Sequence, residues 1–413
     1  MSRLEQARVP PARPSLTYAG LLAQPGAGRA FGAAAVARLS FGMAGLSLLL
    51  LVHQATGSFA AAGAAGGAFS AGTLTAPVKA RLLDRCGQRV MLPLLGLGAA
   101  AAMLALTLLE RTGGRNPAPY IALCAVAGAL IPPVGAAMRA LWAVIAGEGR
   151  NLQRAYSLDA AAEETLFMAG PVLTGLAVTV AGPVLPMLVT AGLLASGCVL
   201  LAASGAGAPA REPRRPGLAG PLAVPGFRVL LAIVLTTSLG LGAIDVTITA
   251  RAVADHHPGA AGYILAAGSL GSALGGLAWG RRRHRSRVST QMAGLLVIMA
   301  GGVTLAAIAP DLLLAGVALA LTGTVLAPSA VVSYLSAERL AGPGAEASTW
   351  VNTAWNGGVA AGLALAGLAV SHTGTTTPLL AGAAVLACAA LAALRRRPVF
   401  DAAATLPPPP DER

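Results

Sequence analysis

The chain has 413 residues, of which 55% are hydrophobic and only 11% are charged, and its mean hydropathy is +0.71. This composition excludes an ordinary soluble domain and indicates an integral membrane protein. The alternating pattern of a transmembrane β-barrel is absent, so we expect the membrane spans to be helices. The net charge of +13 would by itself suit a nucleic-acid-binding protein, but the placement of the basic residues points elsewhere.

Residues 1–30 are rich in proline and arginine, and we expect them to form a disordered cytoplasmic tail. Twelve apolar stretches follow, each near the length of about 20 residues that crosses about 30 Å of hydrocarbon. In the first half they cover residues 31–53, 58–79, 90–109, 119–141, 158–181 and 184–204. In the second half they cover residues 227–249, 259–280, 291–309, 311–334, 347–370 and 377–394.

A polar segment rich in proline, alanine and arginine, residues 205–226, separates the two halves and is predicted to be a cytoplasmic linker. The halves, residues 31–204 and 227–394, show weak internal similarity: residues 40–44 are echoed by 238–242, and residues 170–175 by 357–362. Duplicated bundles allow one bundle to rock against the other around a central site. We therefore expect an all-α membrane protein of two pseudo-symmetric six-helix bundles, followed by a disordered cytoplasmic tail at residues 395–413.

The basic residues are distributed unevenly between the connecting loops. If the N-terminus is cytoplasmic, the outer loops hold only Arg111, Arg115 and Arg251, and nearly all other basic residues fall in the inner loops and tails. This bias orients helical membrane proteins with their positive loops inside. It predicts a multi-pass protein of the plasma membrane with both termini cytoplasmic and the lipid bilayer as its partner, and it argues against nucleic-acid binding.

The loop between the second and third spans, residues 80–89, reads Ala-Arg-Leu-Leu-Asp-Arg-Cys-Gly-Gln-Arg. It resembles the G-x-L-a-D-R-x-G-R-R signature of major facilitator superfamily transporters, with Ala80 in place of the first glycine. The resemblance implies the twelve-helix fold of that superfamily and a gating role for Asp84 and Arg89, in a loop that also holds Arg85 and the turn residue Gly87. The alternative for the loop arginines is simple anchoring of the topology.

The motifs of ATP-driven pumps and of enzymes are missing from the chain. Its only lysine, Lys79, lies in no phosphate-binding loop, and no metal-binding or nucleophile motif is present. The four cysteines are scattered without a metal-site spacing. We therefore expect no enzyme activity, no cofactor and no metal, and transport energy from an ion gradient or from the substrate's own gradient.

Charged residues within spans are functional candidates, because an unpaired charge at the bilayer centre costs at least about 2.5 to 3.5 kcal/mol. Arg38 in the first span and Glu163 and Glu164 in the fifth lie at similar depths, about 8 to 10 Å from the cytoplasmic ends of their predicted spans. Since these spans are neighbours in the resembled architecture, Arg38 is predicted to pair with Glu163 or Glu164, either as a static pair or as a protonation switch.

Three other charged residues are placed outside that group. Asp159 and Arg139 lie nearer the predicted cytoplasmic interface, where a snorkelling anchor or a surface pair is the simpler interpretation. Asp245 lies near the predicted outer end of the seventh span, too far along it to join Arg38.

Two sets of residues are predicted to shape the helices. Gly170 and Pro171 resemble the fifth-helix signature of drug and proton antiporters, with Thr174 in place of a glycine, which points to export; a kink with close helix packing is the alternative. Pro133 in the fourth span and Pro328 in the tenth are predicted to bend their helices.

The eleventh span carries an unusual cluster of Trp350, Asn352, Trp355 and Asn356. The two asparagines are four residues apart and share one helix face. They are predicted to line a substrate cavity, or alternatively to join helices through amide hydrogen bonds.

These features together predict a monomeric secondary transporter that moves a small molecule by alternating access, outward and coupled to protons. The alternatives are an uptake system for a sugar or other metabolite, a transport-inactive membrane sensor and a membrane-embedded enzyme.

Overall fold

The computed structural model describes residues 16–146, 150–204, 221–280, 286–341 and 345–397. Within these ranges the chain forms sixteen α-helices and one short 3-10 helix, Pro221–Ala223. Eleven helical segments there are long and apolar enough to cross a membrane. Four of these spans are single helices of the first half: α2 (Ala27–Thr56), α5 (Gln88–Arg111), α8 (Arg150–Ala181) and α9 (Val184–Ala203). Three are single helices of the second half: α10 (Pro225–Ala254), α11 (Ala260–Gly280) and α12 (Val288–Ile308).

The remaining spans include two more single helices, α15 (Ala345–Thr373) and α16 (Thr376–Arg395). Two spans are each divided into a pair of shorter helices, α6 (Pro117–Leu130) with α7 (Val134–Ala146), and α13 (Leu312–Gly323) with α14 (Leu326–Ala341). The predicted second span is also divided, into α3 (Phe59–Thr73) and α4 (Ala76–Cys86), and each part is too short to cross alone. With this pair the spans follow the twelve that the sequence predicts.

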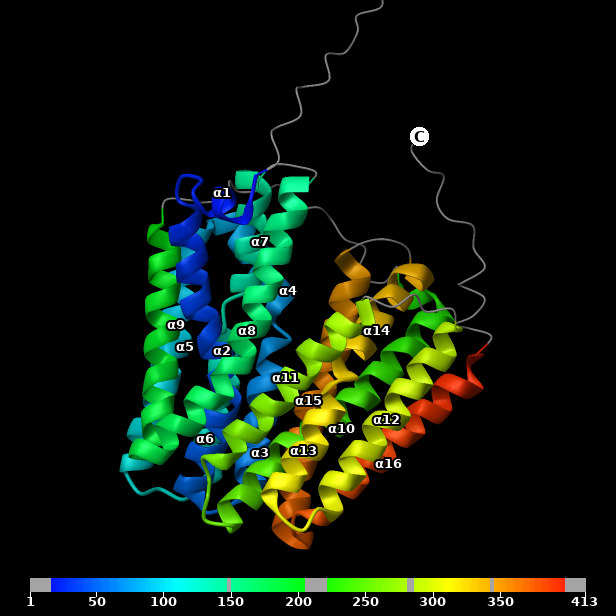
Figure 1. The fold of residues 1–413 in the computed structure, drawn as a ribbon. Helices are drawn as coiled ribbons and strands as arrows, with labels where there is room; N and C mark the ends of the chain where they lie inside the picture. The colour runs from blue at the N-terminus through cyan, green and yellow to red at the C-terminus, as the bar shows by residue number, and fades with distance from the viewer. Residues whose placement is uncertain (1–15, 147–149, 205–220, 281–285, 342–344, 398–413) are drawn as a thin grey trace, which may run out of the picture.

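The helices form two bundles, as Figure 1 shows. In the first bundle α2 packs on α8 and α9, α3 on α6, and α5 on α6 and α9; in the second α10 packs on α15 and α16, α11 on α13, and α12 on α16. Leucine and valine side chains such as Leu108, Val180 and Leu313 are exposed on the outside of the helices. Such an apolar exterior suits contact with lipid.

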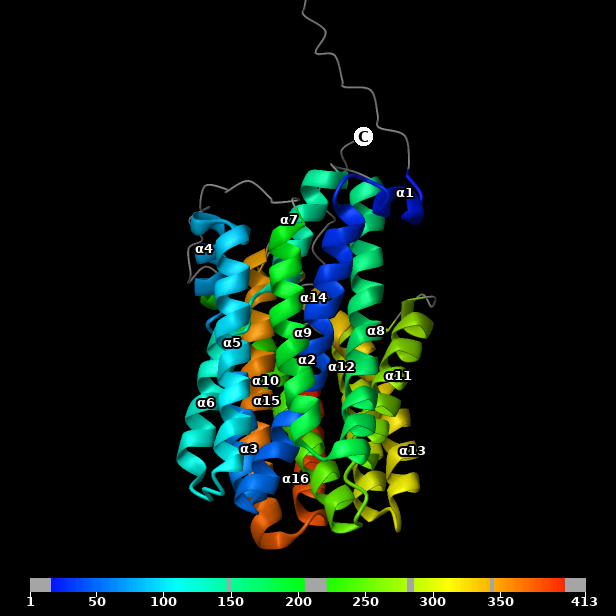
Figure 2. The same cartoon turned by 90° about the vertical axis from the view of Figure 1, so that its left-hand side faces the viewer.

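The two ends of the bundles differ in their connections. We call the end that carries α1 (Tyr18–Leu22) and the last turn of α16 the terminal face, and the opposite end the far face (Figures 1 and 2). At the far face the helices are joined by short turns, four of which contain a glycine with positive φ: Gly57, Gly113, Gly182 and Gly374. These turns hold neighbouring helices close together, because only glycine adopts this conformation without strain.

Glycines of the far half make several of the contacts between the bundles, beside a hydrogen bond from the Ala60 N–H to the Ser371 hydroxyl at 3.0 Å. A methyl group at Gly63 of α3 would come within 2.8 Å of the Gly367 Cα atom in α15, and one at Gly175 of α8 within 2.6 Å of the Gly259 carbonyl oxygen beside α11. A side chain at Gly262 would collide with the carbonyl oxygen of Pro171. At these three glycines the backbones of the two bundles lie in direct contact. Toward the terminal face the bundles diverge (Figure 1).

Similar glycine contacts join helices inside each bundle. Gly170 of α8 lies against Gly42 of α2, and Gly362 of α15 lies against Gly242 of α10. These residues come from the repeated segments of the sequence, so the internal similarity has a physical basis: the first span crosses the fifth as closely as the seventh crosses the eleventh. Within α8 the helix continues through Pro171 without a break.

The breaks in the second and fourth spans lie side by side. The fourth is interrupted at residues 131–133, which include Pro133, and this frees carbonyl groups at the end of α6. The Lys79 Nζ atom donates to the Gly128 carbonyl at 3.4 Å, and the Thr75 hydroxyl donates to the Ala129 carbonyl at 3.1 Å. The break in the tenth span precedes Pro328, which lies in the first turn of α14.

The close contact between α8 and α11 at Gly262 generates a first prediction. Substituting Gly262→Leu should force the far-face ends of α8 and α11 apart, because the new side chain has no space beside the Pro171 carbonyl. Spin labels at Ala181→Cys and His257→Cys, both exposed at the far face, would report this as a longer distance in most molecules. The exposed Cys86 and Cys388 would first be replaced by serine, whereas Cys124 and Cys198 are buried.

The matched control is Gly294→Leu, since a methyl group at Gly294 of α12 would meet no atom within 4 Å. It should leave the distance distribution unchanged. An unchanged distribution in the Gly262→Leu protein would show that this contact does not hold the bundles together.

Candidate functional site: a central cavity and a nearby charge cluster

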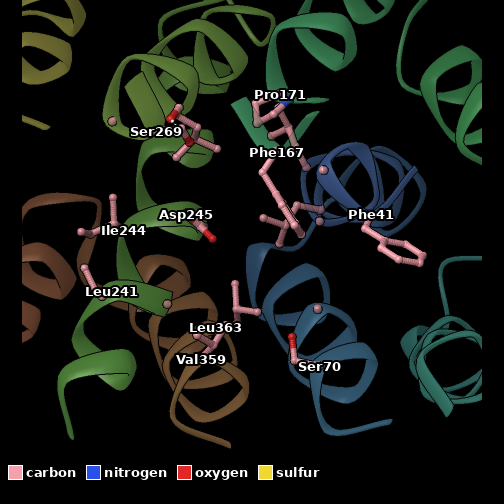
Figure 3. A pocket seen from close by; sticks show the side chains of 18 of the residues that line it. Phe41, Ser70, Phe167, Pro171, Leu241, Ile244, Asp245, Ser269, Val359 and Leu363 are labelled. Carbon is pink, nitrogen blue, oxygen red and sulfur yellow. Dashed lines mark hydrogen bonds between the residues drawn. The ribbon is translucent and has the colours of Figure 1, made fainter. Parts of the chain in front are cut away.

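A cavity of about 600 Å³ lies between the two bundles, near the level where they converge. Its walls come from α2, α3 and α8 of the first bundle and from α10, α11, α13 and α15 of the second. Figure 3 shows Phe41 and Phe167 on one side and Leu241, Ile244 and Val359 on the other. This volume falls within the range of about 300 to 1,000 Å³ that is typical of small-molecule sites.

The polar groups of the cavity are few. Hydroxyl groups come from both bundles, and Asn356 contributes an amide. Asp245 is the single ionisable residue among those that line the cavity in the described part of the chain. Its carboxyl group points into the space between the bundles (Figure 3).

Asp245 lies deeper in its helix than the predicted span implies. The seventh span was predicted to end at residue 249, but α10 continues to Ala254. Asp245 is therefore nine residues, or about 14 Å, from the far end of the helix. It does lie apart from Arg38, as expected, but it belongs to the central cavity.

The structure separates the polar and aromatic cluster of α15. Trp355 and Asn356 line the central cavity. Asn352 instead lines a smaller cavity of about 120 Å³ within the second bundle, and its side-chain oxygen accepts a hydrogen bond from the Tyr334 hydroxyl at 2.7 Å. Trp355 contributes to both cavities, whereas Trp350 packs against the core of the second bundle. The amides thus show both of the arrangements that the sequence left open.

Arg38 makes a buried ion pair with Asp159. The Nη1 atom donates to Oδ1 at 2.7 Å and the Nη2 atom donates to Oδ2 at 2.9 Å, and the two side chains are 1% and 3% exposed. Two parallel charge-assisted bonds of this kind hold both groups in a defined geometry. The prediction that Arg38 pairs with Glu163 or Glu164 is corrected by this contact, as is the placement of Asp159 at the interface.

The reason for the correction is the length of the helices. α2 begins at Ala27, four residues before the predicted span, and α8 begins at Arg150, eight residues before it. Counted from these starts, Arg38 lies 11 residues into its helix (38 − 27), while Asp159 and Glu163 lie 9 and 13 residues into theirs (159 − 150 and 163 − 150). Both acids are therefore near the level of Arg38, and the packing of α2 on α8 brings Asp159 into contact with it.

Glu163 pairs instead with Arg139 of α7, at 3.9 Å between Oε2 and Nη1. These side chains are 31% and 51% exposed, so this pair is looser and wetter than the buried one. A methyl group at Gly135 would lie 3.4 Å from the Arg139 guanidinium nitrogens and 3.6 Å from Nη2 of Arg38. The two pairs therefore form one cluster around Gly135, while the side chain of Glu164 lies outside the described residues.

The segment that carries the transporter signature was predicted to be a loop at residues 80–89, but it is helical up to Cys86, the last residue of α4. The chain turns at Gly87, whose φ of 81° and ψ of 150° suit glycine alone. Arg85 and Arg89 are exposed, and the Gln88 side chain donates to the Ala137 carbonyl of α7 at 3.3 Å. The loop is thereby attached to the helix that carries Arg139. The side chain of Asp84 lies outside the described residues.

The buried pair generates a second prediction. Arg38→Met or Asp159→Leu alone should destabilise the protein by about 3 to 5 kcal/mol, because each leaves one charge buried without its partner. The double variant should recover most of the loss, since both charges are then removed. Thermal unfolding can be followed through the reaction of a thiol dye with Cys124 and Cys198, which are 0% exposed in the folded protein.

Arg139→Met is the control, because its ion pair is half-exposed and should contribute only about 0 to 1 kcal/mol. If the Arg38 and Asp159 single variants unfold at the same temperature as this control, the buried pair does not stabilise the first bundle.

No family model and no curated relative matches the sequence. Solved structures do match the fold over most of its length. A crystal structure of the nucleoside transporter NupG matches with a TM-score of 0.71 at 14% identity, covering 89% of this chain and 99% of that one. The human organic anion transporter MFSD10 (TETRAN) matches with a TM-score of 0.60 at 16% identity, covering 89% and 98%.

A point mutant of the peptide transporter POT, solved in complex with sulfate, matches with a TM-score of 0.68 at 15% identity, covering 94% and 97%. At these identities the likeness shows the fold and leaves the substrate open. This chain has the two-bundle helical fold of the major facilitator transporters, as the resemblance of its loop implied.

Proposed function

We propose that this protein is a secondary transporter that moves a small molecule across the membrane by alternating access. The observation that carries the proposal is the central cavity, which is lined by both bundles and closed toward the far face by contacts between glycines. Smooth glycine surfaces can separate at low cost, and the hydrogen bond from the Ala60 N–H to the Ser371 hydroxyl at 3.0 Å would open with them, so the bundles can rock around the cavity. Because one chain encloses its own cavity, a monomer suffices.

We assign the terminal face to the cytoplasm of a plasma membrane. The inner loops and tails hold nearly all of the basic residues of the chain, which supports this orientation. On this assignment the bundles diverge toward the cytoplasm, and the structure represents an inward-facing state. Asp84 and Arg89, in the loop at this face, would latch the cytoplasmic side when the bundles close.

Protons are the proposed coupling ion, and Glu163 is the proposed carrier. Asp159 is held by two short bonds to Arg38, whereas Glu163 has only a 3.9 Å contact with Arg139 and is 31% exposed. A loosely paired and hydrated carboxylate exchanges its proton with less cost than one in a dry bidentate pair. Glu163 also precedes the cavity residue Phe167 by four residues, which is about one turn of α8.

Outward transport is proposed on the partial resemblance of the segment around Gly170 and Pro171. These residues carry the partial resemblance to proton-coupled drug exporters, and they lie where α8 meets both α2 and α11. Gly170 contacts Gly42 within the first bundle, while the Pro171 carbonyl faces Gly262 across the bundles. Rocking of the bundles would therefore change the contacts of Pro171 and leave those of Gly170 intact.

The third prediction concerns coupling. An expressing strain should be protected against some members of a panel of toxic compounds, and purified protein in liposomes should move a protective compound against its gradient when a pH gradient is imposed. Glu163→Gln should abolish this pH-driven accumulation but retain exchange of labelled for unlabelled compound. The expected cause is the loss of the exchangeable proton with the cavity left unchanged.

Asp255→Asn serves as the matched control, since Asp255 is exposed at the far end of α10 and should leave both activities intact. Flux that is indifferent to the pH gradient would remove proton coupling. Sensitisation in place of protection would indicate uptake, and the absence of any flux would favour a transport-inactive sensor.

A further inference from the structure

We propose that the central cavity binds organic cations with an apolar, aromatic body, and that Asp245 is their counter-ion. This inference rests on the proposed transport function and names the substrate class of the same cavity. It follows from the charge of the cavity wall, from the absence of a described partner for Asp245 and from the apolar surfaces around it.

The first observation is that Asp245 has no cationic partner among the described residues. The two ion pairs found there join Arg38 to Asp159 and Arg139 to Glu163. Arg251, on the same helix, donates instead to the carbonyl groups of Ala306 and Ala309 at the end of α12. Arg38, Arg139 and Arg251 are thus engaged elsewhere, and the Asp245 side chain remains without a hydrogen bond or ion pair in the described part of the chain.

The second observation is the depth of this carboxyl group. Asp245 lies about 14 Å from the far end of a 30-residue helix and points into the space between the bundles (Figure 3). An ionised group this deep in a membrane protein is costly unless it has a partner. A cationic ligand provides that partner, so the carboxylate attracts cations and repels anions of the same shape.

The third observation is the surface that surrounds Asp245. Phe167 of the first bundle and Trp355 of the second line the same cavity as Asp245, among aliphatic side chains such as Leu241 and Val359. Phe41 lines the cavity farther away, on the other side of α2 (Figure 3). Aromatic faces attract cations, and burying a hydrophobic body against the apolar wall makes the free energy of binding more favourable. Small, strongly hydrated cations gain little from such a wall, whereas a delocalised cation on an aromatic body satisfies both features.

The fourth prediction tests the charge preference with two probes of nearly the same size and shape, the tetraphenylphosphonium cation and the tetraphenylborate anion. Equilibrium dialysis of the detergent-purified, unsubstituted chain against each labelled probe should show saturable binding of the cation only. Asp245→Asn should weaken cation binding by about tenfold or more, because a single unscreened charge pair is lost. Asp245→Glu should retain it, and so should Asp255→Asn.

Equal saturable binding of both probes by the unsubstituted protein, or of the anion alone, would overturn the proposal. So would cation binding that survives Asp245→Asn. The comparison of the two probes needs no substitution, so it decides the question even if Asp245→Asn fails to fold. Failure here would leave transport itself standing, since the liposome flux of a protective compound tests that function separately.

Discussion

The structure depends on close contacts between glycine-rich helix surfaces. In a bilayer the lipid tails are as apolar as the helices, so helices associate through packing and not through exclusion of water. Gly63, Gly175 and Gly262 bring the backbones of the two bundles together at the far face, while Gly42 and Gly170 do so inside the first bundle. These backbone approaches are accompanied by side-chain contacts between the bundles, among them a hydrogen bond from the Ala60 N–H to the Ser371 hydroxyl oxygen at 3.0 Å. The small glycine surfaces support the proposal that the bundles separate there as rigid bodies around the cavity.

The second constraint is the cost of charge in the membrane, which the protein meets in three ways. Arg38 and Asp159 neutralise each other in a dry, bidentate pair that joins α2 to α8. Arg139 and Glu163 lie close by in a looser and wetter pair. Asp245 is left without a described partner in the cavity wall. These three degrees of pairing support the proposals of a structural role for the buried pair, of proton coupling by Glu163 and of ligand binding by Asp245.

Much of the architecture could be predicted because hydropathy is a local property. The twelve spans, the turn at Gly87 and the repeated glycines all follow from neighbouring residues in the chain. Helix ends were less certain, since polar residues continue a helix beyond its apolar stretch. The start of α8 was predicted eight residues too late, which placed Asp159 too near the membrane surface to meet Arg38. The end of α10 was predicted five residues too early, which displaced Asp245 from the cavity.

By itself, therefore, the sequence determined the class of protein, the number of spans and the two-bundle division, because each depends on composition and period alone. It also singled out Arg38, Glu163 and Asp245 as charged residues within predicted spans, but it placed Asp159 at the interface. Only the tertiary structure decided which charges meet, that Asn352 and Asn356 enter different cavities, and that Asp245 faces the central one. Those outcomes depend on the rotation and relative height of helices far apart in the chain, which packing between backbones sets and no local pattern records.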